Sequence, residues 1–253
     1  MKIMVINPNT SEGMTDHIRK ELDRIKGKET ELLVTCPDEG PVAIESNYDQ
    51  AFAIPPTLRL VERANREGYD AVIIAAFCDP GLDAAKEISD ILVLGIQEVT
   101  LHVAAMLGAR FTILTMTDEH VPKKYREARH YKMEQSLGSV RPLGLTVTET
   151  DADPARTKEQ VMKIARQAAE GDGAEVIILG CAGMVGYARE VAEELGVTVL
   201  DPTTLTLKIC ESMVEAGVKH SKRALFAKPS IKEFKKVSPT VASFPRSKRL
   251  ERG

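Results

Sequence analysis

Short apolar runs alternate along the chain with longer stretches whose apolar residues recur at helical spacing. Near-continuous apolar runs are typical of parallel strands that helices cover on both faces. In the first half, the runs that predict strands lie at 2–7, 31–36, 70–77 and 91–96. The stretches that predict helices lie near 12–26, 50–67 and 82–88. Alternation of strand and helix indicates βαβ crossovers and a mostly parallel sheet.

The second half repeats this plan. Its predicted strands lie at 111–116, 145–150, 175–180 and 197–202. Each half ends in a strand followed by a helix, near 98–107 in the first half and near 203–216 in the second. The segment DAVIIAAFCDPG (70–81) resembles AEVIILGCAGMV (174–185), which pairs Cys78 with Cys181 at an offset of 103 residues. The pattern therefore predicts a duplicated α/β protein with two pseudo-symmetric domains, each a mostly parallel four-stranded sheet flanked by helices.

The expected domain limits follow from this repeat. The last helix is expected to return to the first half, because each half ends in a strand followed by a helix. The first domain then consists of residues 1–97 plus 203–225, and the second of residues 98–202. Residues 226–253 form a basic tail.

Composition narrows the possible partners. The 253 residues carry a net charge of −3, which argues against nucleic acid as the main partner. From position 219 to the end, eleven Lys or Arg residues stand against two acidic ones, which is typical of a solvated tail. A membrane or nucleic-acid contact of this tail is the alternative. No apolar segment approaches the length of a spanning helix or a signal peptide.

The four cysteines, Cys36, Cys78, Cys181 and Cys210, lack CxxC spacing. A zinc site is therefore not expected, and the five histidines show no mutual metal spacing, although His120 lies in a candidate loop. With no secretion route indicated, we expect reduced thiols in the cytoplasm. Each cysteine then serves either packing or chemistry, and Cys36 and Cys210 fit the packing role.

Ligands of open parallel sheets collect beyond the carboxyl ends of the strands. The predicted strand ends carry polar or reactive segments: NPNTS (7–11), FCDPG (77–81), TMTDEH (115–120), GCAGM (180–184) and DPTT (201–204). A thiol at such a place, next to a helix start, can have a lowered pKa. Cys181 lies between glycines in a predicted tight turn, a setting that a packing cysteine does not need. Cys78 and Asp79 follow the third strand and are also candidates.

Two thiols that face each other across a cleft would suit the inversion of a carbon acid. One base removes a proton from one face of the carbon, and the other returns a proton on the opposite face. The intermediate is an enolate, which N–H groups aimed at its oxygen stabilise. Proton transfer of this kind needs no metal.

Five segments together resemble the aspartate/glutamate/hydantoin racemase superfamily, and most of all its hydantoin and allantoin racemase branch. They are INPNTS (6–11), GPVAIESNYD (40–49), DPGLDAAKE (79–87), ILGCAGM (178–184) and VLDP (199–202). The resemblance implies two flavodoxin-like domains, no cofactor, a small-molecule substrate in a site between the domains, and two cysteines that act as opposed acid and base. A homo-oligomer is also expected from it.

The resemblance also assigns roles to individual residues. Cys181 matches the second-half catalytic cysteine inside GCAGM, and Ala182 and Gly183 would offer backbone N–H groups to a substrate oxygen. The residues that match the site-lining loops are Asn9, Thr10, Thr115 and Thr117, and Asp79 is taken as a substrate-binding neighbour of the first cysteine.

The first-half cysteine departs from the family pattern. The branch carries this cysteine directly at the strand end, a place that Ala76 takes here, whereas Cys78 comes two residues later. An extended segment would keep Cys78 on the same side but displace its thiol by about 6–7 Å along the chain. Cys78 is then either the first base, reached by a remodelled loop, or the first base is missing.

Three functions remain open. The first is a two-thiol racemase that acts on a 5-substituted hydantoin or a related amino-acid derivative. The second is a one-thiol enzyme of the same fold, such as an arylmalonate decarboxylase-like or maleate isomerase-like protein, which depends on Cys181 alone. The third is a binding protein that uses the cleft without catalysis.

Overall fold

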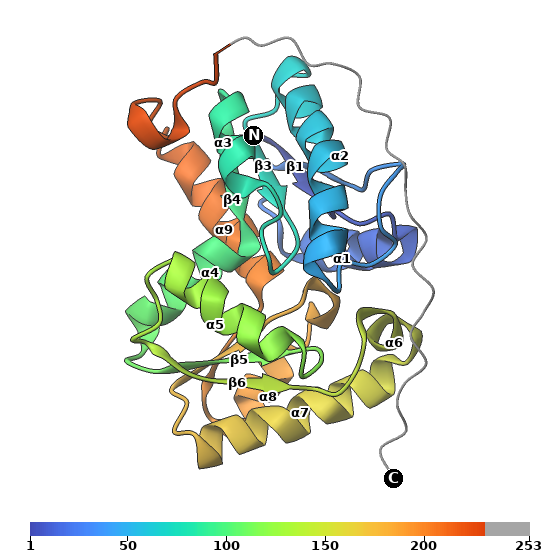
Figure 1. The fold of residues 1–253 in the computed structure, drawn as a ribbon, viewed down its shortest axis with the longest axis vertical. Helices are drawn as coiled ribbons and strands as arrows, with labels where there is room; N and C mark the ends of the chain where they lie inside the picture. Colours follow the sequence, from blue (N-terminus) through green and yellow to red (C-terminus); the bar gives the residue numbers. More distant parts are fainter. Residues whose placement is uncertain (231–253) are drawn as a thin grey trace.

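The computed structural model describes residues 1–230, without the side chains at positions 148, 151 and 183. It contains two four-stranded sheets, one in each half of the molecule (Figure 1). The first consists of β1 (Lys2–Ile6), β2 (Glu31–Thr35), β3 (Ala71–Ile74) and β4 (Leu92–Gly95). The second consists of β5 (Phe111–Thr115), β6 (Leu137–Pro142), β7 (Val176–Leu179) and β8 (Thr198–Leu200).

Both sheets are parallel and share one topology, with orders β2-β1-β3-β4 and β6-β5-β7-β8. The helices are α1 (Glu12–Ile25), α2 (Asn47–Arg66), α3 (Leu82–Ile88), α4 (Ile96–Leu107), α5 (His120–His130), α6 (Val147–Ala152), α7 (Pro154–Gly171), α8 (Ala188–Leu195) and α9 (Pro202–Glu215), with 3₁₀ turns η1 (Ala182–Met184) and η2 (Ala224–Phe226). The predicted fold class, two pseudo-symmetric parallel-sheet α/β units, is confirmed. None of the helices within residues 1–230 is long and apolar enough to cross a lipid bilayer.

The strand β1 shows why these sequences form buried parallel strands. Ile3 and Val5 point into one core, and Met4 and Ile6 point into another, because side chains alternate across a strand. The smaller core lies under α2 and α3. The larger core continues through the second half without interruption, so the two halves share one apolar interior.

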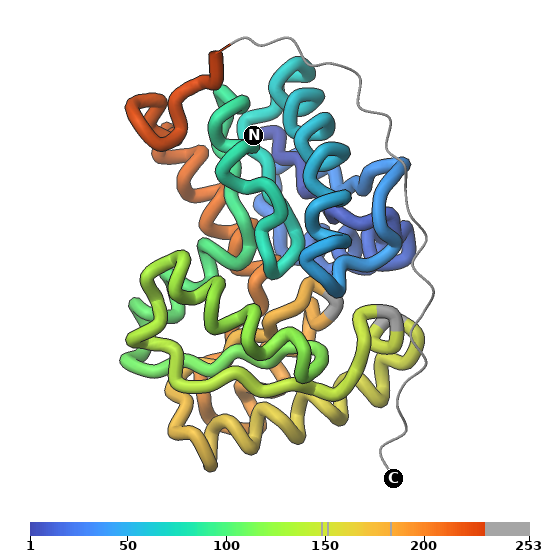
Figure 2. Tube along the Cα trace, viewed as in Figure 1, coloured from blue at the N-terminus to red at the C-terminus, as the bar shows by residue number. Residues whose placement is uncertain are grey.

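The helices α4 and α9 each pack against the sheet that they do not directly follow as well as against each other. Although α4 follows β4 of the first sheet, it packs against β7 and β8 of the second, and α9 returns from β8 to pack against β3, β4 and α1. The two helices also contact each other, as the orange and green segments of Figure 2 show. Cys210 of α9 is fully buried in this region, where it packs as an apolar side chain.

The strand predicted at 145–150 is wrong. Strand β6 lies earlier, at Leu137–Pro142, and residues 147–152 form the short helix α6. The alternating pattern LTVTET suggested a strand, but Thr146 and Glu149 form a capping box in which each side chain accepts a hydrogen bond from the other residue's backbone N–H. This local pairing starts a helix where side-chain alternation alone indicated extended chain.

The first part of the basic C-terminal run packs on the first half. The imidazole of His220 contacts both backbone polar groups of Val93, at 2.9 Å from its nitrogen and 2.8 Å from its oxygen. The ammonium of Lys86 makes a cation–π contact with the ring of Phe226, and Lys228 forms an ion pair with Asp90 at 2.6 Å. Residues 220–228 therefore contact β4 and α3 through a few side chains while most of this segment stays exposed, and the rest of the expected tail, from position 231, lies outside the described residues.

A buried carboxylate on α9 binds this helix to the loop between α1 and β2. Glu211, 6% exposed, accepts hydrogen bonds from the backbone N–H of Gly27 and the hydroxyl of Thr30, both at 2.7 Å. We expect Glu211→Ala to lower the free energy of unfolding by about 1–3 kcal/mol, because two donors lose their acceptor in a buried place. Urea unfolding measures this change. Glu215→Ala, on the exposed end of the same helix, is the control and should stay within about 0.5 kcal/mol of wild type. Equal losses in the two variants would contradict the role of Glu211.

Candidate active site between the two sheets

A small cavity of about 60 Å³ lies where the carboxyl ends of the central strands of both sheets meet. Such strand ends are where parallel α/β folds bind ligands. From the first half it is lined by Asn7, Asn9, Met14, Ile44, Ala75, Ala76, Phe77 and Cys78. From the second half it is lined by Thr115, Met116, His120, Lys123, Lys124, Val147, Gly180, Cys181 and Ala182. The cavity thus brings together Cys78 and Cys181, which are 103 residues apart in the sequence.

Cys181 follows β7 in a tightly packed turn. The N–H of Gly180 donates to the carbonyl of Leu114 at 2.8 Å, and the N–H of Cys181 donates to that of Leu179 at 2.8 Å. A Cβ at position 180 would lie 2.5 Å from the Leu114 oxygen, so only glycine allows this approach. The partly buried Cys181 then begins the turn that continues as η1 with Ala182 and Gly183.

The matching position in the first half is held by Ala76. Strand pairing aligns Ile6 with Ile74 in one sheet and Leu114 with Leu179 in the other. The residue after each aligned pair then makes the same hydrogen bond in both halves. The N–H of Ala75 donates to the carbonyl of Ile6 at 2.8 Å, and the N–H of Gly180 donates to the carbonyl of Leu114 at 2.8 Å. Ala76 is therefore the structural counterpart of Cys181, as the comparison with the racemase pattern indicated, and the pairing of Cys78 with Cys181 predicted from the repeat is wrong by two residues.

Cys78 reaches the cavity through a turn. The N–H groups of Cys78 and Asp79 both donate to the carbonyl of Ala76, at 2.8 and 2.9 Å. Residues 76–79 are therefore folded back and are not extended, so the displacement expected for an extended segment does not apply. Cys78 lines the same cavity as Cys181 although it comes two residues after the matching position.

Three side chains from distant helices hold this turn by its carbonyl groups. Gln50 of α2 donates to the carbonyl of Cys78 at 3.2 Å, and Gln97 of α4 donates to that of Phe77 at 3.2 Å. The ammonium of Lys124 on α5 also donates to the Phe77 carbonyl. No motif in the sequence marks these residues, because each contact joins positions 20 or more residues apart.

Lys124 and its neighbour Lys123 bring positive charge to the cavity. Lys124, 4% exposed, donates to Glu127 at 2.8 Å, and Lys123 donates to Gln50 at 2.9 Å. Burial of the thiol raises the pKa of Cys78 to about 12, although the two ammonium groups oppose this shift. Cys78 is therefore a protonated thiol near neutral pH.

Asp79 lies beside the cavity and not in its wall. Its buried carboxylate accepts hydrogen bonds from the backbone N–H groups of Gln97 and Glu98, at 3.0 and 2.7 Å, and from the hydroxyl of Tyr131 at 2.9 Å. It thus caps the N-terminus of α4, where backbone N–H groups attract negative charge. The role of Asp79 in substrate binding stays a prediction, and its carboxylate has these three protein partners.

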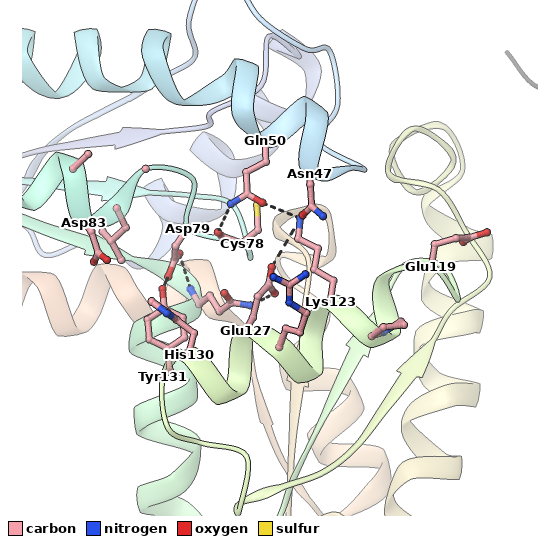
Figure 3. A pocket seen from close by; sticks show the side chains of 16 residues that line it. Asn47, Gln50, Cys78, Asp79, Asp83, Glu119, Lys123, Glu127, His130 and Tyr131 are labelled. Atoms are coloured by element: carbon pink, nitrogen blue, oxygen red, sulfur yellow. Dashed lines mark hydrogen bonds and ion pairs between the residues drawn. The ribbon is translucent and has the colours of Figure 1, made fainter. Parts of the chain in front are cut away.

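An outer pocket of about 620 Å³ lies on the other side of Cys78, between α2, α3 and α5 (Figure 3). Cys78 and Lys123 line both spaces, so together they form part of the wall between the small cavity and the outer pocket. Asp79, Gln97 and Tyr131 line the outer pocket. Among the residues that the structure describes, no three His, Cys, Asp or Glu side chains lie close enough together to hold a metal ion.

Of the other predicted site residues, Asn9, Thr115 and Ala182 line the cavity, and Thr10 and Thr117 support loops next to it. The N–H of Thr10 donates to the carbonyl of Pro41 at 3.0 Å. The hydroxyl of Thr117 contacts Nδ1 of His120 at 3.0 Å. Within the described residues, neither threonine is part of the cavity wall.

His120 connects the two halves over the cavity. Its Nε2 lies 2.8 Å from the carbonyl of Glu45, a loop residue of the first half. A carbonyl only accepts, so Nε2 carries the proton, and Nδ1 accepts from the Thr117 hydroxyl in the neutral imidazole. Burial, aided by Lys124, lowers the pKa of His120 and favours this neutral form. The Glu45 carboxylate also accepts from the N–H of Val147 at 3.0 Å, which fixes the same loop to α6.

Two α/β halves with one strand order each place a cysteine in the lining of a shared cavity at their strand ends. The sequence profile of the Asp/Glu/hydantoin racemase family matches residues 3–210. The chain is 36% identical over 235 residues to a hydantoin racemase from Paenarthrobacter aurescens. The matched region covers 92% of this chain and all of that protein. The protein therefore belongs to the Asp/Glu/hydantoin racemase family and is an isomerase of the racemase class.

Solved structures agree with this assignment. The allantoin racemase from Klebsiella pneumoniae superposes with a TM-score of 0.90 at 32% identity, over 93% of this chain and 96% of that one. Arylmalonate decarboxylase superposes with a TM-score of 0.62 at 17% identity, over 87% of this chain and 95% of that one. The second likeness shows a shared fold alone.

The raised pKa of Cys78 predicts its reactivity. A thiolate is the species that reacts with iodoacetamide, and its fraction rises about tenfold per pH unit below the pKa. We expect alkylation of Cys78 in the folded, ligand-free protein to be at least about 100-fold slower near pH 8 than in the urea-unfolded chain. The rate should still rise between about pH 9 and pH 10, and peptide mass spectrometry measures it. A rate that levels off near pH 9, as for an ordinary thiol, would contradict the shift.

Proposed function

We propose that this protein is a racemase that inverts a stereocentre next to a carbonyl by proton transfer between Cys78 and Cys181. The observation that carries the proposal is that these two cysteines, one from each half, line one cavity between the sheets. Thiols on opposite walls can address the two faces of a carbon without turning the substrate. The relatives named hydantoin racemase and allantoin racemase support a 5-substituted hydantoin or a related cyclic ureide as the substrate.

In the proposed reaction, a thiolate on one side removes the proton from the stereocentre. The C–H bond breaks, an S–H bond forms, and the electron pair enters the neighbouring carbonyl as an enolate. The thiol on the other side then donates its proton to the opposite face of the carbon and becomes a thiolate. Because burial of the thiol favours the protonated form of Cys78, we assign the donor role in the first turnover to Cys78 and the base role to Cys181.

Positive charge near the cavity supports the enolate. Lys123 and Lys124 line the cavity, and a positive group in a buried place stabilises negative charge more strongly than it does in water. The backbone N–H groups of Ala182 and Gly183, at the start of η1, are the proposed partners of the developing oxyanion. Ile44 and Val147 contribute apolar wall on the side where the halves meet, which limits water.

Cysteine substitutions test the proposal. We expect Cys78→Ser and Cys181→Ser each to lower kcat for racemisation of 5-benzylhydantoin by at least about 100-fold, because a serine hydroxyl is a far weaker acid than a thiol and does not form its alkoxide base near neutral pH. Loss of optical rotation measures the rate. Cys36→Ser, at the end of β2 and away from the cavity, is the control and should keep wild-type activity. Racemisation at the wild-type rate in either site variant would exclude the two-thiol mechanism.

One observation favours a second candidate function. Ala76 takes the position that matches Cys181, so a site that depends on one thiol is the alternative, as in a decarboxylase of a substituted malonate or a cis–trans isomerase of maleate. This candidate predicts turnover of phenylmalonate or maleate that is lost with Cys181→Ser and kept with Cys78→Ser. The absence of turnover on all these substrates would favour a protein that binds ligand without catalysis.

The assembly and location of the protein stay predictions. We expect a homo-oligomer in the cytoplasm that works without a cofactor, and light scattering on the purified protein measures its mass.

A further inference from the structure

Asn7 stands at the end of β1 with its side chain in the cavity wall and only 1% exposed. Its amide nitrogen, Nδ2, lies 2.8 Å from Oδ1 of Asn9, 3.0 Å from the hydroxyl of Thr15 and 3.3 Å from the carbonyl of Ser11. All three partners belong to the start of α1 or to the loop before it. The nitrogen side of the amide is therefore directed toward α1.

The partners of the amide fix its orientation. A carbonyl oxygen such as that of Ser11 can only accept, and Oδ1 of Asn9 is itself identified as an acceptor because the N–H of Ser11 donates to it at 2.9 Å. A flipped Asn7 amide would place its oxygen against both of these oxygens. The nitrogen must therefore occupy this side, and Oδ1 of Asn7 must occupy the other side of the amide fork.

The oxygen of this amide has no protein partner. Within the described residues, Oδ1 of Asn7 is buried and accepts no hydrogen bond. Buried polar atoms in native proteins nearly always have a partner, so an orphan acceptor in the wall of a cavity indicates a donor that arrives with a ligand. The charged groups that line the same cavity are Lys123 and Lys124, and both ammonium groups already have protein acceptors.

We infer that Oδ1 of Asn7 accepts a ring N–H of the substrate and selects cyclic ureides against dicarboxylates. A cyclic ureide carries N–H donors next to its carbonyl groups, whereas a malonate or maleate dianion offers only acceptor oxygens, which the Asn7 oxygen repels. A site that hydrogen-bonds a substrate group discriminates strongly against a molecule that lacks it, because the buried partner stays unpaired. The inference rests on the proposed function, since it names the feature of the substrate that this site recognises.

The test compares substrates that differ in one N–H group. We expect 1-methyl- or 3-methyl-5-benzylhydantoin to lose at least about tenfold in kcat/KM relative to 5-benzylhydantoin with the wild-type protein, depending on which nitrogen faces Asn7. Asn7→Ser should lower kcat/KM for 5-benzylhydantoin and bring the ratio between it and the sensitive methyl derivative close to one. Such a loss of coupling between a residue and a substrate group is what a direct contact predicts.

Thr15→Val is the matched control. It removes one partner of the Asn7 nitrogen and leaves the oxygen unchanged, so the discrimination against the methyl derivative should stay at the wild-type value. Thermal unfolding of each variant identifies loss of folding. Equal kcat/KM for all three hydantoins with wild type, or the same ratio in wild type and Asn7→Ser, would overturn the inference.

Binding to Cys78→Ser separates this inference from the proposed function. Calorimetry with this variant should show weaker binding of the sensitive methyl derivative than of 5-benzylhydantoin, and no detectable binding of phenylmalonate. If this discrimination is found but wild type does not racemise the hydantoin, the proposed function fails and the role of Asn7 stands. If wild type racemises all three hydantoins equally, or phenylmalonate binds as well as the hydantoin, the role of Asn7 fails.

Discussion

The buried carboxylate of Asp79 joins the two halves of the molecule at the place where Cys78 is held. It caps the first turn of α4, the helix that follows the first sheet and packs against the second. It also accepts a hydrogen bond from the hydroxyl of Tyr131, the residue that follows α5. A Cβ at Gly95 would lie 2.3 Å from the Asp79 carboxyl carbon, so only glycine lets β4 pass this close. Asp79 itself has a φ of 42°, a conformation that costs energy outside glycine and that its three hydrogen bonds sustain. The turn that carries Cys78 depends on this contact.

This constraint explains how a near-symmetric fold contains an asymmetric site. The two sheets share their strand order, and the ladders close identically at Ala75 and Gly180. Beyond these residues the halves differ, since Cys181 follows directly in a glycine-flanked turn, whereas Cys78 follows a folded segment held by Gln50, Gln97 and Lys124. The proton chemistry proposed for the two thiols thus depends on two different turns: the glycine-flanked turn of Cys181, and the turn of Cys78 that side chains from other helices hold in place.

Much of the fold could be predicted because it depends on local pattern. Apolar strands and helical spacing defined the duplicated α/β plan. The repeat itself paired Cys78 with Cys181, two residues away from the structural match, and only the comparison with the racemase pattern indicated Ala76. The error at 145–150 arose because Thr146 and Glu149 form a capping box inside an alternating segment. The contacts of Asp79, Lys124 and Asn7 could not be predicted, since their partners lie on other elements and a single sequence does not show which side chains meet.

Isotope incorporation during a single passage from one enantiomer to the other tests the two-thiol account most directly. With one enantiomer of 5-benzylhydantoin in deuterated water, at low conversion, two opposed monoprotic thiols deliver deuterium only when they form the mirror image. The account therefore predicts deuterium at the stereocentre of nearly all product molecules and of almost none of the remaining substrate. Deuterium that appears equally in the remaining substrate would show that one group works on both faces, and it would contradict the opposed roles of Cys78 and Cys181.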